Sequence, residues 1–222
     1  MLRVEFHCHT IYSKDSLTPV EKLIETCRRR RIDRVVITDH NTIAGAVQAQ
    51  QIEPERVILG EEILTTRGEI LAAFVQEEIP AGLEPPEVIA RLRQQGAFIS
   101  VSHPFDHRRE GAWRLADLQA IAPLVDAIEV FNARCLLPTP NRQALAFARQ
   151  HGLPGTVGSD AHAAYELGMA TLLLPEFTSA DELKQVIRSG EIHTRRSGPW
   201  VFLASRYAKL YKKYLRKKVT QE

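Results

Sequence analysis

The feature that most constrains the fold is a regular alternation of short β-rich runs with amphipathic helical patterns. Strands that alternate with helices pair in parallel, so this order predicts an α/β fold with a parallel sheet. With about seven strands, closure into a barrel of the (β/α)₈ type is favoured, and an open doubly wound sheet is the alternative. The expected strands span residues 3–9, 34–40, 56–64, 69–75, 97–103, 127–132, 155–162 and 170–175, and the expected helices include 18–31, 42–51, 85–96 and 179–190.

Local signals mark where two of these helices begin. Thr18 and Pro19 precede the first helix, and Glu21 has the spacing that completes a capping box with Thr18. Ser179 is the expected cap of the last of the four helices. The two β-rich runs before and after residues 65–68 are separated by a short polar connection, which predicts a hairpin.

Length and composition indicate an ordinary globular domain. The chain has 222 residues, of which 44% are hydrophobic and 25% charged, enough for a full-sized core. No apolar run approaches the roughly 18 residues of a membrane span, and a strand begins too early for a secretory signal. The cysteines Cys8, Cys27 and Cys135 are scattered and odd in number. We therefore expect free, core-packed thiols and a cytoplasmic protein.

The C-terminal segment differs from the rest in charge. Residues 206–218 carry seven Lys or Arg and no acid, whereas the remaining residues carry 22 basic and 27 acidic side chains. We expect a barrel domain over 1–200 and a basic amphipathic helix over 201–222. The favoured interpretation is that its apolar stripe packs on the barrel, and the alternative is that its basic face gathers nucleic acid or an acidic membrane surface. The stripe consists of Tyr207, Leu210, Tyr211, Tyr214 and Leu215.

Polar residues gather where the expected strands end. His7 and His9 share one face of the first strand and Cys8 points the other way, because side chains alternate along a strand. The carboxyl ends of parallel strands meet at one edge, so polar residues there converge. Five of the eight histidines take part, which a random scatter over the surface would not produce. The set is His7, His9, Asp39, His40, Glu61, Glu62, His103, Asn132, Asp160 and His162.

The residue types at these strand ends predict a metal centre. Imidazole and carboxylate without thiolate suit Zn, Mn or Fe. Several carboxylates favour more than one ion, because a bridging carboxylate lets two cations lie close together. Two-metal hydrolysis uses ions about 3.5–4 Å apart, which lower the pKa of a bound water and neutralise charge on a phosphoryl group.

Five motifs carry a resemblance to a known family. "FHCHTIYSKDS", "VVITDHN", "GEEI", "SHPFD" and "GSDAH", in this order and spacing, resemble the PHP (polymerase and histidinol phosphatase) family from residue 2 to about 170. The resemblance implies a distorted (β/α)₇ TIM-like barrel with two or three divalent metal ions at the C-terminal ends of the strands. It also implies hydrolysis of phosphate esters.

The resemblance implies three groups of metal ligands that share one carboxylate. The first ion would take His7, His9, Glu62 and Asp160; the second would share Glu62 and take His103; the third would take Asp15, His40 and His162.

One position departs from the family pattern. The hairpin strand "GEILAAF" lacks a histidine that many members carry, and Glu69 or Asn132 would have to fill that place if the second ion is to be held well. Asp39 has the opposite parity to His40 and is expected to orient an imidazole. Glu61 is expected to be structural.

The favoured activity is metal-dependent hydrolysis of a phosphate ester. The substrate would be a small phosphomonoester, a nucleotide or a short oligonucleotide, and no side chain is required as a separate general base. Arg134, in the loop after the fifth βα strand, could grip phosphate, whereas Arg108 and Arg109 are more often surface residues. The alternatives are an amidohydrolase that acts on C–N bonds and a catalytically idle metal-binding module that recruits partners. The oligomeric state is left open.

Overall fold

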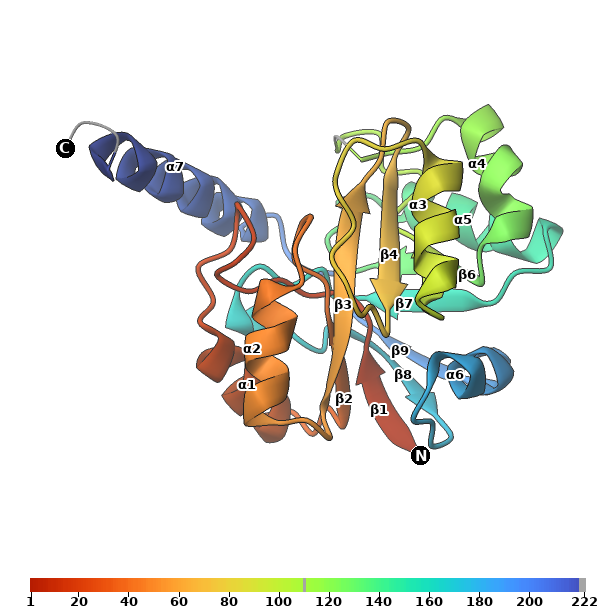
Figure 1. The fold of residues 1–222 in the computed structure, drawn as a ribbon, viewed down its shortest axis with the longest axis horizontal. Helices are drawn as coiled ribbons and strands as arrows, with labels where there is room; N and C mark the ends of the chain where they lie inside the picture. The colour runs from red at the N-terminus through yellow and green to blue at the C-terminus, as the bar shows by residue number, and fades with distance from the viewer. Residues whose placement is uncertain (110, 220–222) are drawn as a thin grey trace.

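The computed structural model describes residues 1–109 and 111–219, and Figure 1 shows its sheet with helices on the outside. The strands are β1 (Leu2–Glu5), β2 (Arg34–Ile37), β3 (Val57–Leu64), β4 (Glu69–Ala73), β5 (Phe98–Val101), β6 (Ala127–Asn132), β7 (Gly155–Gly158), β8 (Ala170–Leu174) and β9 (Glu191–Thr194). The α-helices are α1 (Val20–Arg29), α2 (Ala44–Ile52), α3 (Pro85–Gln94), α4 (Leu115–Ile121), α5 (Pro138–Gln150), α6 (Ala180–Val186) and α7 (Val201–Val219). Short 3₁₀ turns η1 (Ala122–Leu124), η2 (Ala164–Glu166) and η3 (Ile187–Ser189) lie between them.

The strands form one sheet in the order β7-β6-β5-β4-β3-β2-β1-β8-β9. Neighbours from β1 to β3 and from β5 to β7 are parallel, and β4 is antiparallel to both β3 and β5. The pairing of β3 with β4 is the expected hairpin. Strands β1 to β7 therefore follow one another around a ring in chain order.

Backbone hydrogen bonds between the segments that follow β1 and β7 bring the two ends of this ring together. His9 N donates to Ala161 O at 2.8 Å, and Asp160 N donates to His7 O at 2.8 Å. A bridge pairs Cys8 with Ala161 in parallel. The sheet is thus a nearly closed barrel, so the predicted barrel is confirmed over the open doubly wound alternative.

The strands are shorter than expected at the functional edge. β1 ends at Glu5, so the two histidines that open the chain's motif lie beyond it, held by the closing bonds. Gly158 ends β7 at a point where a Cβ would come within 2.3 Å of His7 Cβ. The missing side chain lets the last ring strand approach the first, and any larger residue would push His7 aside.

Strands β8 and β9 lie outside the ring. β8 pairs antiparallel with β1, and β9 pairs antiparallel with β8 at the sheet edge. The sequence does not predict β9, because all four of its residues are exposed. An exposed edge strand has no alternation of buried and exposed side chains by which to recognise it.

The expected capping box at the first helix is wrong. α1 begins at Val20 with Pro19 as its N-cap and no side-chain hydrogen bond there. The hydroxyl of Thr18 donates instead to the backbone oxygen of His162 at 3.2 Å. Ser179 does cap α6, accepting from Glu182 N at 3.2 Å. The Thr18 hydroxyl therefore bonds to the loop after β7 and does not cap the helix.

The C-terminal helix packs with a different face from the one expected. Among residues 201–215 of α7, whose burial the structure describes, the buried ones are Val201, Ser205 and Ala208, whereas Tyr207 and Leu210 are 63% and 68% exposed. The whole predicted stripe is exposed, so the interpretation that it packs on the barrel is wrong. In Figure 1 the later part of α7 extends beyond the barrel. Residues 220–222 of the expected helix lie outside the described residues.

Two composition-based expectations concern thiols and membranes. Cys8, Cys27 and Cys135 are free and buried, as expected. Between residues 1 and 219, leaving out residue 110, the helices include none with the length and hydrophobicity to cross a membrane.

Candidate metal centre

Four side chains beyond the ends of the barrel strands form a compact group of ligand atoms. His7 Nε2 and His9 Nε2 lie 3.1 Å apart, and each lies 3.4 Å from Glu62 Oε2. Asp160 Oδ1 lies 3.3 Å from His9 Nε2 and 3.7 Å from His7 Nε2. Ligands about 2.0–2.1 Å from a tetrahedral ion lie about 3.3–3.4 Å from one another. The spacing of this group therefore fits a single divalent ion.

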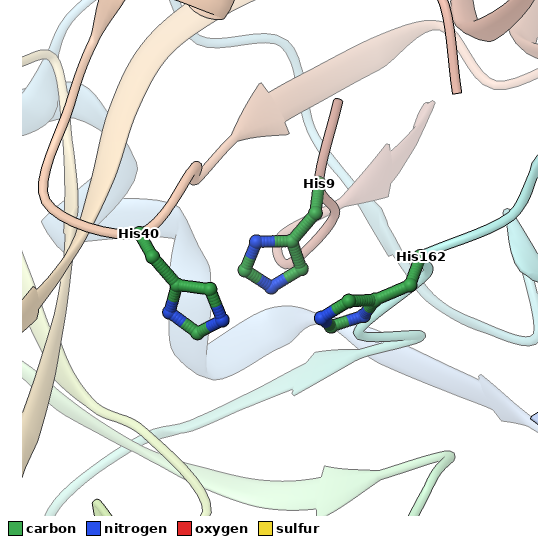
Figure 2. Close-up of side chains that lie close together, drawn as sticks. All are labelled: His9, His40 and His162. Carbon is green, nitrogen blue, oxygen red and sulfur yellow. The ribbon is translucent and has the colours of Figure 1, made fainter. Parts of the chain in front are cut away.

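A second group surrounds Asp15. Its Oδ1 lies 3.2 Å from His162 Nε2 and 3.5 Å from His40 Nε2. Figure 2 shows the rings of His9, His40 and His162 turned toward one another, and their ligand nitrogens all lie within 4.8 Å of each other. The structure thus places the residues assigned to the third ion beside those assigned to the first.

Glu69, the residue predicted as a possible replacement for the missing hairpin histidine, lies beside His103 and His40. Its Oε2 lies 3.5 Å from His103 Nε2, and its Oε1 lies 3.9 Å from His40 Nδ1. Glu62 Oε1 lies 3.3 Å from the same His103 nitrogen. Glu69 is 7% exposed, so it is not a solvated hairpin residue. It therefore joins Glu62 and His103 at the position assigned to the second ion.

Asn132 forms a hydrogen bond with Asp160, one of the candidate metal ligands. Its side-chain nitrogen donates to Asp160 Oδ2 at 3.1 Å and to Glu129 Oε2 at 3.2 Å. Its side-chain oxygen accepts from Arg134 N at 3.0 Å. Since both polar atoms of the amide are used in this way, we expect Asn132 to orient Asp160 rather than to bind an ion.

Carboxylates behind the imidazoles fix which nitrogen faces the centre. Glu129 Oε1 lies 2.9 Å from His7 Nδ1, which leaves His7 Nε2 toward the other ligands. Asp39 acts through a hydroxyl, because Ser13 Oγ donates to Asp39 Oδ1 at 2.7 Å and lies 3.0 Å from His9 Nδ1. Outer partners of this kind set the tautomer and orientation of metal-binding histidines. Asp39 thus orients an imidazole, as expected, but indirectly.

The charges of the centre suit cations. Burial would raise the pKa of Asp160, but the Arg109 guanidinium and His7 hold it well below its usual value. The pKa of Glu62 is likewise well below its usual range despite burial, because His7 and His40 lie beside it. Burial, together with the neighbouring His162 and His40, lowers the pKa of His9. Asp160 and Glu62 are therefore ionised and His9 is neutral, the states in which these groups bind metal. Despite burial, the Glu62 carboxylate raises the pKa of His7 and His40, so these two imidazoles have to release a proton when a cation binds.

Two buried oxygens indicate that the group is incomplete without a cation. Asp15 Oδ1 and Glu62 Oε2 have no hydrogen-bond partner among the residues that the structure describes. Leaving an ionised oxygen buried without a partner is costly. Both atoms face imidazole nitrogens: Asp15 Oδ1 lies 3.2 Å from His162 Nε2, and Glu62 Oε2 lies 3.0 Å from His40 Nδ1 and 3.4 Å from His7 Nε2. The donor set therefore fits divalent ions held by nitrogen and oxygen.

Arg109 is not the surface residue that the sequence predicts, and Arg134 lines the pocket but is held by buried partners. Arg109, expected at the surface, has its guanidinium in contact with Asp160 and 3.3 Å from the Asn132 side-chain oxygen. Arg134, expected at the mouth for phosphate, has a side chain that is 4% exposed and lies against Glu166 and His162. Tertiary packing decides both cases, because the loop after β5 folds inward while the loop after β6 is covered by α7.

Three acidic residues support the site without standing in any of the sequence motifs. Glu5 accepts from the backbone nitrogens of Ser159 and Gly168, both at 2.9 Å. Glu129 holds His7, and Glu166 accepts from His162 N at 3.3 Å. Glu5 lies between the buried Val4 and Phe6, and Glu129 lies between the buried Ile128 and Val130, which is a signal that could have found them. Glu166 has no such pattern around it.

Comparisons with known proteins agree with this geometry. The PHP domain family profile matches residues 5–85, and the PHP-associated family profile matches residues 138–192. An uncharacterized protein of Methanocaldococcus jannaschii, MJ0417, is 36% identical over 178 residues, which cover 79% of this chain and 71% of that protein. A second protein of that organism, MJ1587, also uncharacterized, is 35% identical over 146 residues, covering 60% of this chain and 82% of its own length.

Solved structures share the fold at low sequence identity. PsfC from Pseudomonas syringae has a TM-score of 0.66 at 19% identity, covering 97% of this chain and 100% of that protein. A candidate metal-dependent phosphoesterase from Bifidobacterium adolescentis has a TM-score of 0.62 at 20% identity, covering 85% and 96%. An amidohydrolase from Chromobacterium violaceum has a TM-score of 0.59 at 16% identity, covering 82% and 95%. The family profiles and the extent of the match to MJ0417 place this chain in the PHP domain family.

Proposed function

We propose that this chain is a metal-dependent phosphoesterase with two or three divalent ions, Zn, Mn or Fe, at the strand-end centre. The observation that carries the proposal is the combination of a metal-ligand floor with a basic rim in one pocket. The pocket has a volume of about 330 Å³, which suits a small ligand. His40, Glu69, His103, Asp160 and His162 are among the side chains on its floor.

The rim of the pocket is strongly basic. The basic residues that line it are Lys14, Arg108, Arg109, Arg134, Arg206 and Lys209. Of these, Arg134 and Lys209 are already paired with Glu166 and Asp15. Arginine and lysine are the side chains that bind phosphate, arginine with two parallel N–H donors. A substrate that carries phosphate is therefore attracted to the pocket, whereas a neutral amide gains nothing from this rim. The basic rim favours phosphate esters over the C–N bonds of an amidohydrolase.

The residues of the site have separable roles in this proposal. Divalent ions held here would supply a nucleophile at neutral pH and a counter-charge for phosphoryl oxygens. Arg109 contacts Asp160 with one terminal nitrogen, and each terminal nitrogen carries a second N–H that can reach a phosphate oxygen. Glu129 and Ser13 hold the imidazoles of His7 and His9 in place. Catalysis then rests on positioning and charge rather than on a separate general base.

The idle-module alternative loses its main support. It depends on the missing hairpin histidine, and Glu69 of the same hairpin offers a carboxylate 3.5 Å from His103 Nε2 in its stead. We propose a small phosphomonoester, a nucleotide or a short oligonucleotide as substrate. Of the solved structures with this fold, an endonuclease from Pyrococcus furiosus and the candidate phosphoesterase are named for phosphate-ester chemistry.

The purified chain is expected to hold two or three metal ions. The reason is the convergence of five imidazoles with four carboxylates, including oxygens that lack a hydrogen-bond partner among the described residues. Elemental analysis of the protein after gel filtration measures the metal content per chain. Trace metal only, with no uptake when Zn²⁺, Mn²⁺ or Fe²⁺ is added back, would contradict the proposed centre.

A substrate panel tests the reaction itself. Metal-loaded protein is assayed with added Mn²⁺ against sugar phosphates, nucleoside monophosphates, short oligonucleotides and a set of amides, with release of phosphate, nucleotide or amine as the readout. Hydrolysis of any phosphate ester that stops with chelator supports the proposal. Turnover confined to the amides would establish the amidohydrolase alternative, and a loaded protein inactive on every member would favour the idle module.

A further inference from the structure

The start of helix α7 lies against the metal centre. Arg134 Nη2 donates to Val201 O at 2.9 Å and to the Ser205 hydroxyl, while its other terminal nitrogen lies 2.5 Å from His162 Nδ1. Ser205, Arg206 and Lys209 line the same pocket as the ligands. A helix outside both family matches therefore forms one wall of the site.

Two lysines of α7 contact the loop that carries Asp15. Lys209 Nζ lies 3.3 Å from Asp15 Oδ2. Lys212 Nζ donates to the backbone oxygens of Ile11 and Ser13. The two lysines, about one helical turn apart, thus contact this loop from Ile11 to Asp15.

These contacts converge on a single ion position. Asp15 has one oxygen toward Lys209 and the other toward His40 and His162. The ligand oxygen is the one that lacks a hydrogen-bond partner among the described residues. Lys209 therefore contacts Asp15 Oδ2, the oxygen that faces away from the expected ion position, and so fixes the rotation of the carboxylate group.

We propose that α7 is a positioning element of the metal centre, in which Lys209 holds Asp15 for the ion bound by Asp15, His40 and His162. This inference rests on the proposed function, because it requires that the centre binds metal. Lys209 is a positioning residue here and touches no reacting atom. The basic segment then serves the site directly, and its charge is not merely that of a solvated tail.

Two opposing effects of Lys209 decide whether its loss weakens or strengthens metal binding. A lysine near a cation repels it, and a lysine that holds a ligand in place raises affinity. The Lys209 side chain is 53% exposed, so solvent screens its repulsion of an ion beyond the carboxylate. Loss of an outer partner of a metal ligand typically costs about 10–100-fold in metal affinity. The positioning effect therefore outweighs the repulsion, and loss of Lys209 should weaken binding.

The test is Mn²⁺ binding to three single variants. Metal-free protein is titrated with Mn²⁺, and free Mn²⁺ is measured by electron paramagnetic resonance. Lys209→Met is expected to weaken one site about tenfold or more and to leave the remaining sites unchanged. Lys209→Arg, which keeps a positively charged donor, is expected to retain most of the Mn²⁺ affinity of that site. Lys213→Met is the matched control, since it removes the same charge from an exposed position of α7 outside the pocket.

The outcomes separate this inference from the proposed function. If the unaltered protein binds Mn²⁺ and Lys209→Met binds every ion equally well, the positioning role is overturned while the phosphoesterase proposal stands. If Lys209→Met weakens all sites together and lowers the melting temperature, Lys209 serves the fold, which also overturns the inference. An unaltered protein that takes up no Mn²⁺, Zn²⁺ or Fe²⁺ overturns both.

Discussion

Replacing Asp160 with asparagine is expected to lower phosphoesterase turnover at least about tenfold while the barrel remains folded. Asp160 Oδ1 lies 3.3 Å from His9 Nε2 and 3.7 Å from His7 Nε2, and its other oxygen contacts Arg109. The substitution keeps the shape but removes the charge that draws both the ion and the guanidinium. Asparagine is the appropriate variant because residue 160 has φ of 51°, a conformation that Asn tolerates better than Ala.

The measurement is kcat with the best substrate of the panel, alongside metal content and the circular dichroism spectrum. Asp181→Asn is the matched control, since it removes one carboxylate from the exposed first turn of α6. Turnover by Asp160→Asn above about a tenth of the original, with full metal content, would contradict a direct role for Asp160 in holding the ion.

The strand-end residues were predictable because two simple rules of β structure bring them together. His7 and His9 lie beyond β1, but the chain around Cys8 still bridges to Ala161, so the alternation expected of a strand puts both imidazoles on one side. The parallel pairing puts the ends of β1, β2 and β3 together. These rules need no knowledge of side-chain packing. The structure brings each of the eight residues that the family resemblance names within 4 Å of at least one other of them.

The supporting residues were less predictable because they depend on how loops fold back. Ser13 reaches both His9 and Asp39 only after the loop that follows β1 turns over the barrel. Arg109 lies after β5 in a run of charged residues that a sequence cannot distinguish from a solvated loop. Neither position follows a helical or strand periodicity, so local pattern carries no information about it.

Helix α7 shows the same limit for a regular element. Its sequence has two faces with apolar residues, one of large side chains and one of small ones such as Ala208. Hydrophobicity alone favours burial of the large stripe. The structure buries the small face because Arg134 and the Asp15 loop need a close approach of the helix backbone, and tyrosines would hold the helix away.

Replacing Arg134 with methionine is expected to lower the free energy of unfolding by about 3 kcal/mol, because it leaves Glu166 without its buried counter-charge. Arg134 Nε lies 3.3 Å from Glu166 Oε2, and both side chains are almost fully buried. Urea unfolding followed by circular dichroism measures the change. Arg91→Met is the control, since its exposed pair with Glu87 contributes only about 0.3–0.5 kcal/mol.

The contribution of Glu166 to the free energy of unfolding should depend on pH. Burial raises the pKa of Glu166 from 4.5 to about 7, although Arg134 opposes the rise. The folded state therefore holds this proton more tightly than the unfolded chain, and the contribution of Glu166 to stability falls as pH rises from about 4.5 to 7. In Arg134→Met the pKa of Glu166 rises further, so the fall in its contribution to stability should extend to higher pH than in the unaltered protein.

A second substitution separates the structural role of Arg134 from a role in phosphate binding. If Arg134 acts through Glu166, then Arg134→Met combined with Glu166→Gln should recover a large part of the lost stability, because no buried charge remains at this pair. If Arg134 instead bound phosphate at the mouth, Arg134→Met would unfold at nearly the original urea concentration and raise KM for the substrate. The burial of Arg134 beneath Phe202 and Ser205 of α7 favours the first result.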